Sequence, residues 1–347
     1  MVGLSGEEGA RAMQRRDAGG DQRGEVDLSL LGDEYDSVVR IGEGSEGVVY
    51  IVTSREAHRK RFAIKAYKTT SKKGVSTAAI REIGLLRDLD HENVVRLHKV
   101  HVLDSGIFLA CEACSTDLQQ VIKHHLGSGR PIPEYTLKSV LWQILRGVDY
   151  LHANWVMHRD LKPDNILLDG REGKAKIGDF GLARVFKDSL QPLKSNGVVV
   201  TLWYRAPELL LGAQHYTPAV DVWAVGCLFG ELLRLRPLFH AEQRPGTKFQ
   251  VKQMERILNV LGVPRGKSAW SDLPHWKHNT DKIAEYKPPK GKARKIETMV
   301  GLDKGSRALS LLRRLLEYDP AKRISAQQAL EHEYFRTQPF PGSSFSL

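Results

Sequence analysis

The stretch that decides the fold is HRDLKPDN, residues 158–165. Fourteen residues after its asparagine comes DFG, residues 179–181, and RAPE at residues 205–208 closes the 30-residue segment that DFG opens. Taken singly, DFG could be a turn and Ala-Pro-Glu the beginning of a helix. In this order and at this spacing, the three pieces indicate parts of one catalytic unit.

Each polar residue of these pieces suits one step of a group transfer. Asp160 is placed to accept a proton from an attacking hydroxyl group and to orient that group. Asn165 and Asp179 carry the hard oxygen ligands that Mg²⁺ prefers. Lys162 can lie beside a phosphoryl group during its transfer.

A glycine-rich loop, IGEGSEGVVY, occupies residues 41–50. The GxGxxG pattern is weak evidence alone, and in a dinucleotide site its last glycine opens a helix. Here β-branched and aromatic residues follow at positions 48–52, so the loop returns into a strand. We interpret it as a hairpin whose small residues let the backbone approach phosphates closely.

Lys65 and Glu82 form a second expected constellation. Lys65 ends FAIK, whose alternation predicts a strand, and apolar residues at helical spacing predict a helix over 76–89. Glu82 lies off that apolar stripe and could reach Lys65. An ion pair would hold the ammonium group against nucleotide phosphates, whereas the alternative is a lysine on a solvated strand edge.

Together these motifs resemble the signature of eukaryotic protein kinases, from about Tyr35 to Phe335. The resemblance implies an α+β, bilobal fold, with a small antiparallel β lobe carrying one regulatory helix and a large, mostly α-helical lobe. The expected boundaries are a flexible N-terminal tail at 1–33, a kinase domain at 34–336 (N-lobe 34–111, hinge 112–117, C-lobe 118–336, basic insertion near 282–307) and a C-terminal tail at 337–347.

The resemblance also implies a site, with ATP between the lobes and its adenine against the hinge backbone. Mg²⁺ would be bound by Asn165 and Asp179. The expected catalytic residues are Asp160, Lys162, Lys65, Glu82 and Thr201. The expected ATP-binding residues are Ile41, Gly42, Glu43, Gly44, Ser45, Gly47, Val49, Ala63, Lys65, Glu112, Cys114, Asp117, Asn165, Leu167 and Asp179.

Further stretches narrow the resemblance. Lys162 within its motif is typical of serine/threonine kinases, and STAAIRE at residues 76–82 resembles the cyclin-binding helix of cyclin-dependent kinases. The sequence resembles the Mediator-associated, cyclin C-dependent branch at residues 150–156, 198–201 and 212–217. It resembles the plant and algal form of this branch at residues 273–276 and 332–336. The alternatives are a related kinase outside Mediator and a scaffold that acts mainly by occupancy.

This branch implies partners, substrates and a nuclear location. We expect a cyclin C-like protein on the Ser76–Glu82 helix, Mediator kinase-module subunits, and Ser/Thr-Pro substrates. Val199, Val200 and Arg205 would form a pocket for the proline, whose missing N–H leaves no donor unsatisfied there. Without a cyclin, we expect the helix to be rotated outward and the Lys65–Glu82 pair to be broken.

One regulatory residue departs from the pattern. Asn196 stands where cyclin-dependent kinases commonly carry a phosphothreonine, yet the three arginines that would clamp the phosphate are present: Arg81, Arg159 and Arg184. Clustered guanidinium groups should recruit an anion. Phosphorylated Ser195 and an acidic side chain from a partner are the two expected sources.

Composition excludes several other classes of protein. The chain has 347 residues and a net charge of +11, concentrated at residues 55–73 (net +7) and 282–307 (net +5). The sequence contains no nucleic-acid-binding signature and no apolar run long enough to span a membrane. We therefore expect neither nucleic acid nor a membrane as a direct partner. Cys111 and Cys114 have CxxC spacing, but no second ligand pair for zinc follows.

Overall fold

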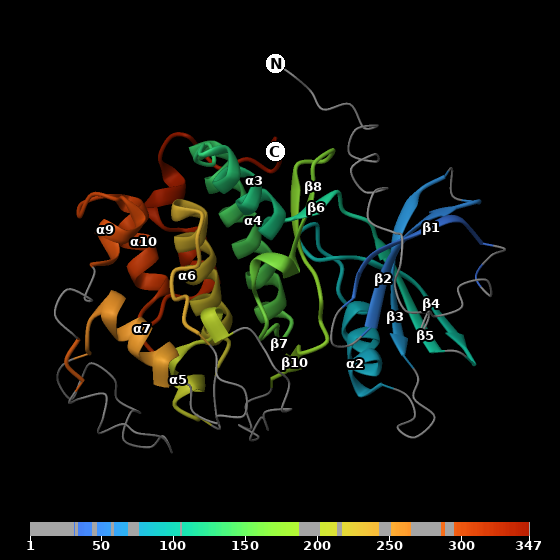
Figure 1. Cartoon of the computed structure of the whole chain (residues 1–347), viewed down its shortest axis with the longest axis horizontal. Coiled ribbons are helices and arrows are strands. Elements are labelled where there is room, and N and C mark those ends of the chain that lie inside the picture. The colour runs from blue at the N-terminus through green and yellow to red at the C-terminus, as the bar shows by residue number, and fades with distance from the viewer. Residues whose placement is uncertain are drawn as a thin grey trace.

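The computed structural model describes residue 31 and residues 34–43, 47–56, 59–68, 76–104, 106–186, 202–213, 217–242, 251–264, 286–288 and 295–346. Within them the chain forms a small lobe built on one sheet and a large, mostly helical lobe, which lie side by side in Figure 1. The predicted α+β bilobal fold is confirmed.

The small lobe contains a five-stranded antiparallel sheet in the order β1-β2-β3-β5-β4. Alternation along β3 buries Phe62, Ile64 and Ala66 in an apolar core on one face and turns Lys65 and Tyr67 to the other. The strands are β1 (Tyr35–Glu43), β2 (Gly47–Ser54), β3 (Arg61–Lys68), β4 (Leu97–Leu103) and β5 (Gly106–Glu112).

Helix α2 (Thr77–Leu86) covers the face to which Lys65 points. Ser76 caps the helix, because its Oγ accepts the backbone N–H of Ala79 at 3.4 Å. Glu82 faces the sheet and is only 3% exposed, whereas Ile80 on the outer side is 58% exposed. The helix therefore delivers one carboxylate to the interior and leaves an apolar side chain outside.

The large lobe is organised around α4 and α6, both of which are mostly buried. A three-stranded sheet (β6-β8-β9) and a two-stranded sheet (β10-β7) adjoin α4 where the lobes meet. The helices are α3 (Leu118–Ser128), α4 (Glu134–Ala153), α5 (Pro207–Leu210), α6 (Ala219–Arg234), α7 (Val251–Leu261), α9 (Ile296–Val300), α10 (Arg307–Leu315) and α11 (Ala326–Leu330). The short strands are β6 (Thr116–Asp117), β7 (Val156–Met157), β8 (Ile166–Asp169), β9 (Lys174–Ile177) and β10 (Arg184–Val185), and 3₁₀ turns lie at Pro163–Asn165, Leu202–Tyr204 and Glu333–Arg336.

The structure shows ordered contacts in parts of three expected segments: the N-terminal tail, the basic insertion and the C-terminal tail. Leu31, the one described residue of the expected N-terminal tail, is buried in the small-lobe core. In the expected basic insertion, α9 forms and buries Ile296 and Val300, while residues 282–285 and 289–294 lie outside the described part. The expected C-terminal tail packs against α4 through Thr337–Ser346.

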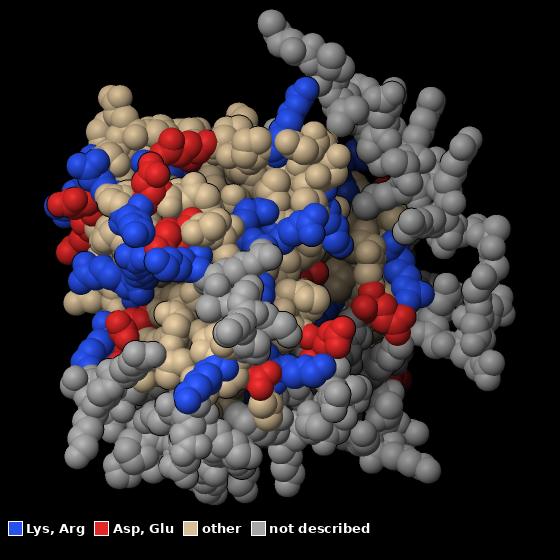
Figure 2. Space-filling model, turned by 60° about the vertical axis from the view of Figure 1, so that its left-hand side comes forward, with Lys and Arg blue, Asp and Glu red and all other residues tan. Residues whose placement is uncertain are grey.

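Charge on the surface is mixed. On the face shown in Figure 2, acidic side chains interrupt the basic ones wherever grey atoms do not cover the surface. Among the described residues, no helix is both long and apolar enough to cross a membrane. The excess of positive charge therefore does not form one continuous basic surface on the visible part of this face.

A buried carboxyl group links the end of the activation segment, the stretch from DFG to RAPE at residues 179–208, to α6. Tyr204 donates a hydrogen bond from its hydroxyl to Glu231 Oε2 at 2.7 Å, and Glu231 is 1% exposed. Its other oxygen, Oε1, is buried with no hydrogen-bond partner within the described ranges. Burial raises the pKa of Glu231 from its ordinary 4.5 to about 7.

This carboxyl group should make stability depend on pH. Between about pH 4.5 and about pH 7 the folded chain holds a proton on Glu231 that the unfolded chain has released. The free energy of unfolding therefore falls as the pH rises through this window, by at most about 1.4 kcal/mol per pH unit from this group. Glu231→Gln, which can still accept from Tyr204, should remove that decline.

Denaturant unfolding at a series of pH values measures the effect. Glu331→Gln, at an exposed position, is the matched control and should leave the slope unchanged. An identical pH slope in the Glu231→Gln variant and the parent chain would contradict the assignment.

Candidate active site

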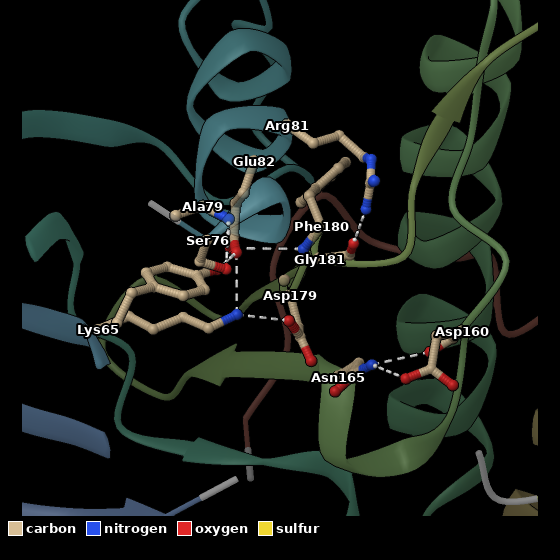
Figure 3. A network of polar contacts seen from close by, with 12 residues as sticks. Lys65, Ser76, Ala79, Arg81, Glu82, Asp160, Asn165, Asp179, Phe180 and Gly181 are labelled. Carbon is tan, nitrogen blue, oxygen red and sulfur yellow. Dashed lines mark hydrogen bonds and ion pairs between the residues drawn. The ribbon is translucent and has the colours of Figure 1, made fainter. Parts of the chain in front are cut away.

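Lys65 is the centre of a contact between three segments (Figure 3). Its Nζ lies 2.9 Å from Glu82 Oε2 of α2 and 2.7 Å from Asp179 Oδ1, just after β9. Both carboxylates share one ammonium group, so a single side chain of β3 ties the regulatory helix to the DFG motif. The ion pair that the sequence suggested between Lys65 and Glu82 is therefore present.

Glu82 has two further partners besides Lys65. The Tyr67 hydroxyl donates to the same oxygen, Oε2, and the backbone N–H of Phe180 donates to Oε1 at 3.4 Å. These contacts supply the physical reason that α2 is turned inward in this structure. The expectation of an outward-rotated helix with a broken ion pair concerns the chain without a cyclin, and it stays a prediction.

The shared contact keeps Lys65 and Asp179 charged. Burial alone would lower the pKa of Lys65, but the carboxylates of Glu82 and Asp179 outweigh it and hold that pKa well above the usual value. For Asp179, burial acts to raise the pKa, yet the Lys65 ammonium outweighs it and the pKa lies below the ordinary value. Asp179 is thus a carboxylate, the form that binds a cation.

Asp160 lies at the other side of the site and is 8% exposed. Its Oδ2 accepts hydrogen bonds from Lys162 Nζ at 2.6 Å and from Asn165 Nδ2 at 3.1 Å. Asn165 Nδ2 also donates to the backbone carbonyl of Asp160 at 2.8 Å. The carboxylate is therefore fixed through one oxygen, while Oδ1 has no hydrogen bond from the described residues.

The donor set fits a hard divalent cation. The amide nitrogen of Asn165 is committed to Asp160, which directs its oxygen away from that residue and toward the side of Asp179 in Figure 3. An amide oxygen and an ionised carboxylate are ligands that Mg²⁺ accepts, with water and phosphate oxygens completing its shell. No cluster of three or more His, Cys, Asp or Glu side chains suited to a metal occurs in the described ranges.

A buried aspartate of α6 shapes the loop that carries Asp160. Asp221, 1% exposed, accepts from the backbone N–H groups of His158 at 2.9 Å and Arg159 at 2.7 Å, and it contacts His152 Nε2 at 3.0 Å. Burial acts to raise the pKa of Asp221, but the contact with His152 and the other donors outweigh it and lower the pKa. The loop is thus held by a fixed negative charge.

The loop and the DFG motif also contact each other directly. His158 Nε2 lies 2.9 Å from the carbonyl oxygen of Gly178, and its ring packs edge-on against Phe180 at 5.1 Å. Arg159 and Asp179 have φ angles of 71° and 60°, in the left-handed region that non-glycine residues rarely adopt. Arg159 follows His158 and Asp179 follows Gly178, so the backbone strain lies beside both residues of this contact, inside the site.

The hinge begins where β5 ends, at Glu112. The Glu112 carboxylate accepts from the backbone N–H of Arg96 at 2.7 Å and pairs with Lys176 Nζ at 3.0 Å. Its backbone N–H donates to the Arg96 carbonyl at 3.0 Å, so its carbonyl oxygen would be the group left for an adenine ring. Ala63 pairs with Cys111 across β3 and β5, so both lie beside the expected adenine position.

The hinge cysteines are thiols, not thiolates. Burial raises the pKa of both Cys111 and Cys114 to about 12, and the Glu82 and Glu112 carboxylates respectively add to the effect. Because the thiolate is the nucleophile and the metal ligand, neither redox chemistry nor zinc binding is favoured here.

Asp117 has a structural role that the sequence interpretation did not include. Its Oδ1 accepts the backbone N–H of Gln120 at 2.8 Å and its Oδ2 accepts from the Gln120 side chain at 2.7 Å, so it caps α3. It also pairs with Leu167 of β8, so these two expected ATP-binding residues are neighbours in the β6-β8-β9 sheet. Val49 pairs with Lys65 across β2 and β3.

The structure describes some of the remaining expected residues and not others. Ile41, Gly42 and Glu43 end β1 and Gly47 begins β2, on the two sides of the glycine-rich loop. Arg81 donates to the Gly181 carbonyl at 2.6 Å and Arg184 to the Ala183 carbonyl at 3.0 Å, so both contact the first part of the activation segment. Gly44, Ser45, Ser195, Asn196, Val199, Val200 and Thr201 lie outside the described residues, while Arg205 lies beside Asp160 at a small cavity.

Sequence reasoning missed three residues of the site: Tyr67, His158 and Asp221. His158 stands in the quoted motif, but only the fold brings it to Gly178 and Phe180. The sequence does contain a signal for Asp221, because an acidic residue stands out in a nearly continuous apolar helix, where an unpaired charge is costly.

Comparison with known proteins agrees with this geometry. The family model described as "Protein kinase domain" matches residues 35–335. The chain is 47% identical to Cyclin-dependent kinase E-1 of Arabidopsis thaliana, over 89% of this chain and 67% of that protein. It is 44% identical to Probable cyclin-dependent kinase 8 of Dictyostelium discoideum (89% and 82% covered) and 44% identical to Serine/threonine-protein kinase SSN3 of Yarrowia lipolytica (88% and 78% covered).

The match spans both lobes and every described element of the site, from the start of β1 to the last 3₁₀ turn. Family membership implies the use of ATP and a divalent metal ion. The similar proteins are named as cyclin-dependent or serine/threonine kinases. The chain belongs to the protein kinase family, among its cyclin-dependent serine/threonine kinases.

Proposed function

We propose that this chain is the cyclin-activated kinase of a Mediator complex in the nucleus, and that it transfers the γ-phosphoryl group of ATP to serine or threonine followed by proline. The observation that carries the catalytic part is the contact of Lys65 with both Glu82 and Asp179. The names of the similar proteins support the cyclin, and the stretches quoted from the sequence support the Mediator branch.

In this proposal each polar residue has one task. Asp160 is fixed through Oδ2 and presents Oδ1 to the substrate hydroxyl group, whose proton it accepts. Lys162, held against Asp160, lies where it can stabilise negative charge on the group in transfer. Lys65 contacts the phosphates of ATP, and Asp179 and Asn165 hold Mg²⁺, which neutralises charge on those phosphates when bound.

The cyclin would bind the outer side of α2. Ile80 is apolar and 58% exposed there, and it lies on the opposite side of the helix from Glu82. Burying this side chain under a partner fits an interface core. A bound partner would then press α2 toward the sheet and hold the Lys65–Glu82 contact.

We propose two sources for the anion that the three arginines would recruit. Phosphorylated Ser195 and an acidic partner side chain would both supply the charge. Full activity of a cyclin complex carrying Ser195→Ala would eliminate the first source, and loss of activity with this variant would support it.

One assay tests class, partner and substrate preference together. The purified chain, with and without a cyclin C-like protein, is given ATP, Mg²⁺ and a peptide with Ser-Pro repeats. We expect transfer to require the cyclin, to fall by about 10²–10⁴-fold in Asp160→Asn because the proton acceptor is lost, and to fall when Ser-Ala replaces Ser-Pro. Equal transfer without the cyclin, or with Asp160→Asn, would overturn the proposal.

A pair of variants tests the Lys65 contact. Glu82→Gln removes a charge that holds Lys65, so we expect kcat/KM of the cyclin complex to fall by about 10–100-fold. Tyr67→Phe removes one hydrogen bond to Glu82 but keeps the ion pair, and it should cause the smaller loss. Steady-state kinetics at varied ATP concentration make the comparison, and a larger loss in Tyr67→Phe would show that the ion pair is not the decisive contact.

A further inference from the structure

The C-terminal segment Thr337–Ser346 forms no helix or strand, yet side chains of α4 hold its backbone. Besides Gln143, three α4 side chains donate to its carbonyl oxygens, and one hydroxyl of α4 accepts from its N–H. These contacts are Tyr135 to Ser344 (2.9 Å), Thr136 to Ser346 (3.2 Å), Lys138 to Thr337 (3.0 Å) and the N–H of Gly342 to Ser139 (2.9 Å). The backbone of this segment has no helix or strand partners, and side chains of α4 satisfy its polar groups individually. The segment therefore has a defined path across α4.

Two buried side chains depend on this path. Phe345 is 5% exposed and belongs to the large-lobe core. Lys138 is 0% exposed, with its Nζ 4.5 Å from the centre of the Tyr334 ring, and burial lowers its pKa. A buried ammonium group is costly unless hydrogen-bonded, and the Thr337 carbonyl at 3.0 Å is such a partner.

The far end of the segment lies against the turn between β8 and β9. The N–H of Phe345 donates to the carbonyl of Gly173 at 3.1 Å. Gly173 has φ +64°, and a Cβ built there would lie 2.4 Å from both the N and the O of Phe345. The close approach therefore requires glycine in the turn.

Gln143 of α4 joins this segment to the same hairpin. The side chain is 1% exposed, and its Nε2 donates to the carbonyls of Gly342 and Gly173, each at 3.3 Å. Its Oε1 accepts from the N–H of Ala175 at 2.7 Å and from Asn93 Nδ2 at 3.2 Å. One buried amide thus connects the C-terminal segment, α4, β9 and the loop after α2.

We propose that residues 337–346 act as a strap that positions the β8–β9 hairpin, with Gln143 as the positioning residue between them. Asn165 lies immediately before β8 and Asp179 lies two residues after β9, so the hairpin carries both expected metal ligands. Small displacements of such groups lower the rate of phosphoryl transfer. The proposal rests only on the family's phosphoryl transfer, not on the identity of the cyclin or substrate.

Two phenylalanines of the strap give a matched test in the full-length chain. Phe345→Ala removes the buried anchor, while Phe340→Ala makes the same change at a side chain that is 56% exposed. We expect Phe345→Ala to speed hydrogen exchange at the Ala175 and Ile177 amides at least tenfold and to lower kcat several-fold with little change in the KM for the peptide. Phe340→Ala and the conservative Phe345→Leu should stay close to the parent chain in both measurements.

A milder variant guards against general loss of folding. Tyr135→Phe with Ser139→Ala removes two strap hydrogen bonds without opening a large cavity. It should raise exchange at Ala175 and Ile177 in the same direction but less, while core amides of α6 stay protected. Unchanged exchange in β9 with both variants, or equal acceleration in β9 and α6, would overturn the proposal, and neither result would bear on the proposed partner or substrate.

Discussion

The contact of one lysine with two carboxylates is the constraint on which the rest of the structure depends. Lys65 and Glu82 have side chains 18% and 4% exposed, so both have lost most of their water. At an effective dielectric constant of about 20, their attraction at 2.9 Å is about 6 kcal/mol. Removing each ion from water costs several kcal/mol, so the pair alone roughly breaks even. Asp179, Tyr67 and the Phe180 amide add the further contacts that favour this arrangement.

The large lobe supplies the matching fixed frame through α6. This helix is apolar on almost every side, and its few polar residues each hold a different part of the site. Asp221 fixes the loop of Asp160 and Glu231 fixes Tyr204. Near its N-terminus, the carbonyl of Ala219 accepts from Arg323, which also forms a two-bond ion pair with Glu208 at 2.8 and 3.0 Å. Removing one partner of such a buried pair leaves an uncompensated charge, which is costly. Because of this cost, a few polar contacts are enough to fix the position of a long loop.

The sequence allowed the fold and the catalytic residues to be predicted because their motifs combine local spacing with distinctive residue types. Asp160, Asn165, Asp179 and Lys65 all lie in stretches that can be read without tertiary structure. Gln143 and Asp221 were not predicted because their partners lie 30–199 residues away, and nothing near them in the sequence indicates the contacts. The carboxylate of Asp117 also caps α3, a role that the following helical pattern could have suggested. The C-terminal residues looked like a tail because their order comes from side chains of α4, not from a pattern of their own.

The inward position of α2 bears on the proposal that a cyclin binds this helix. A partner can shift an equilibrium between two helix positions only by the difference in its affinity for them. In the inward position, Glu82 has three partners, and all of them belong to this chain. What the chain leaves uncovered is the outer side of α2, where Ile80 is exposed to water. A partner that buries this side chain favours the inward position by hydrophobic burial, at about 25 cal/mol per Å², rather than by building the ion pair anew. The electrostatic contact would then be the element that partner binding holds in place, and the apolar face of the helix the means by which it does so.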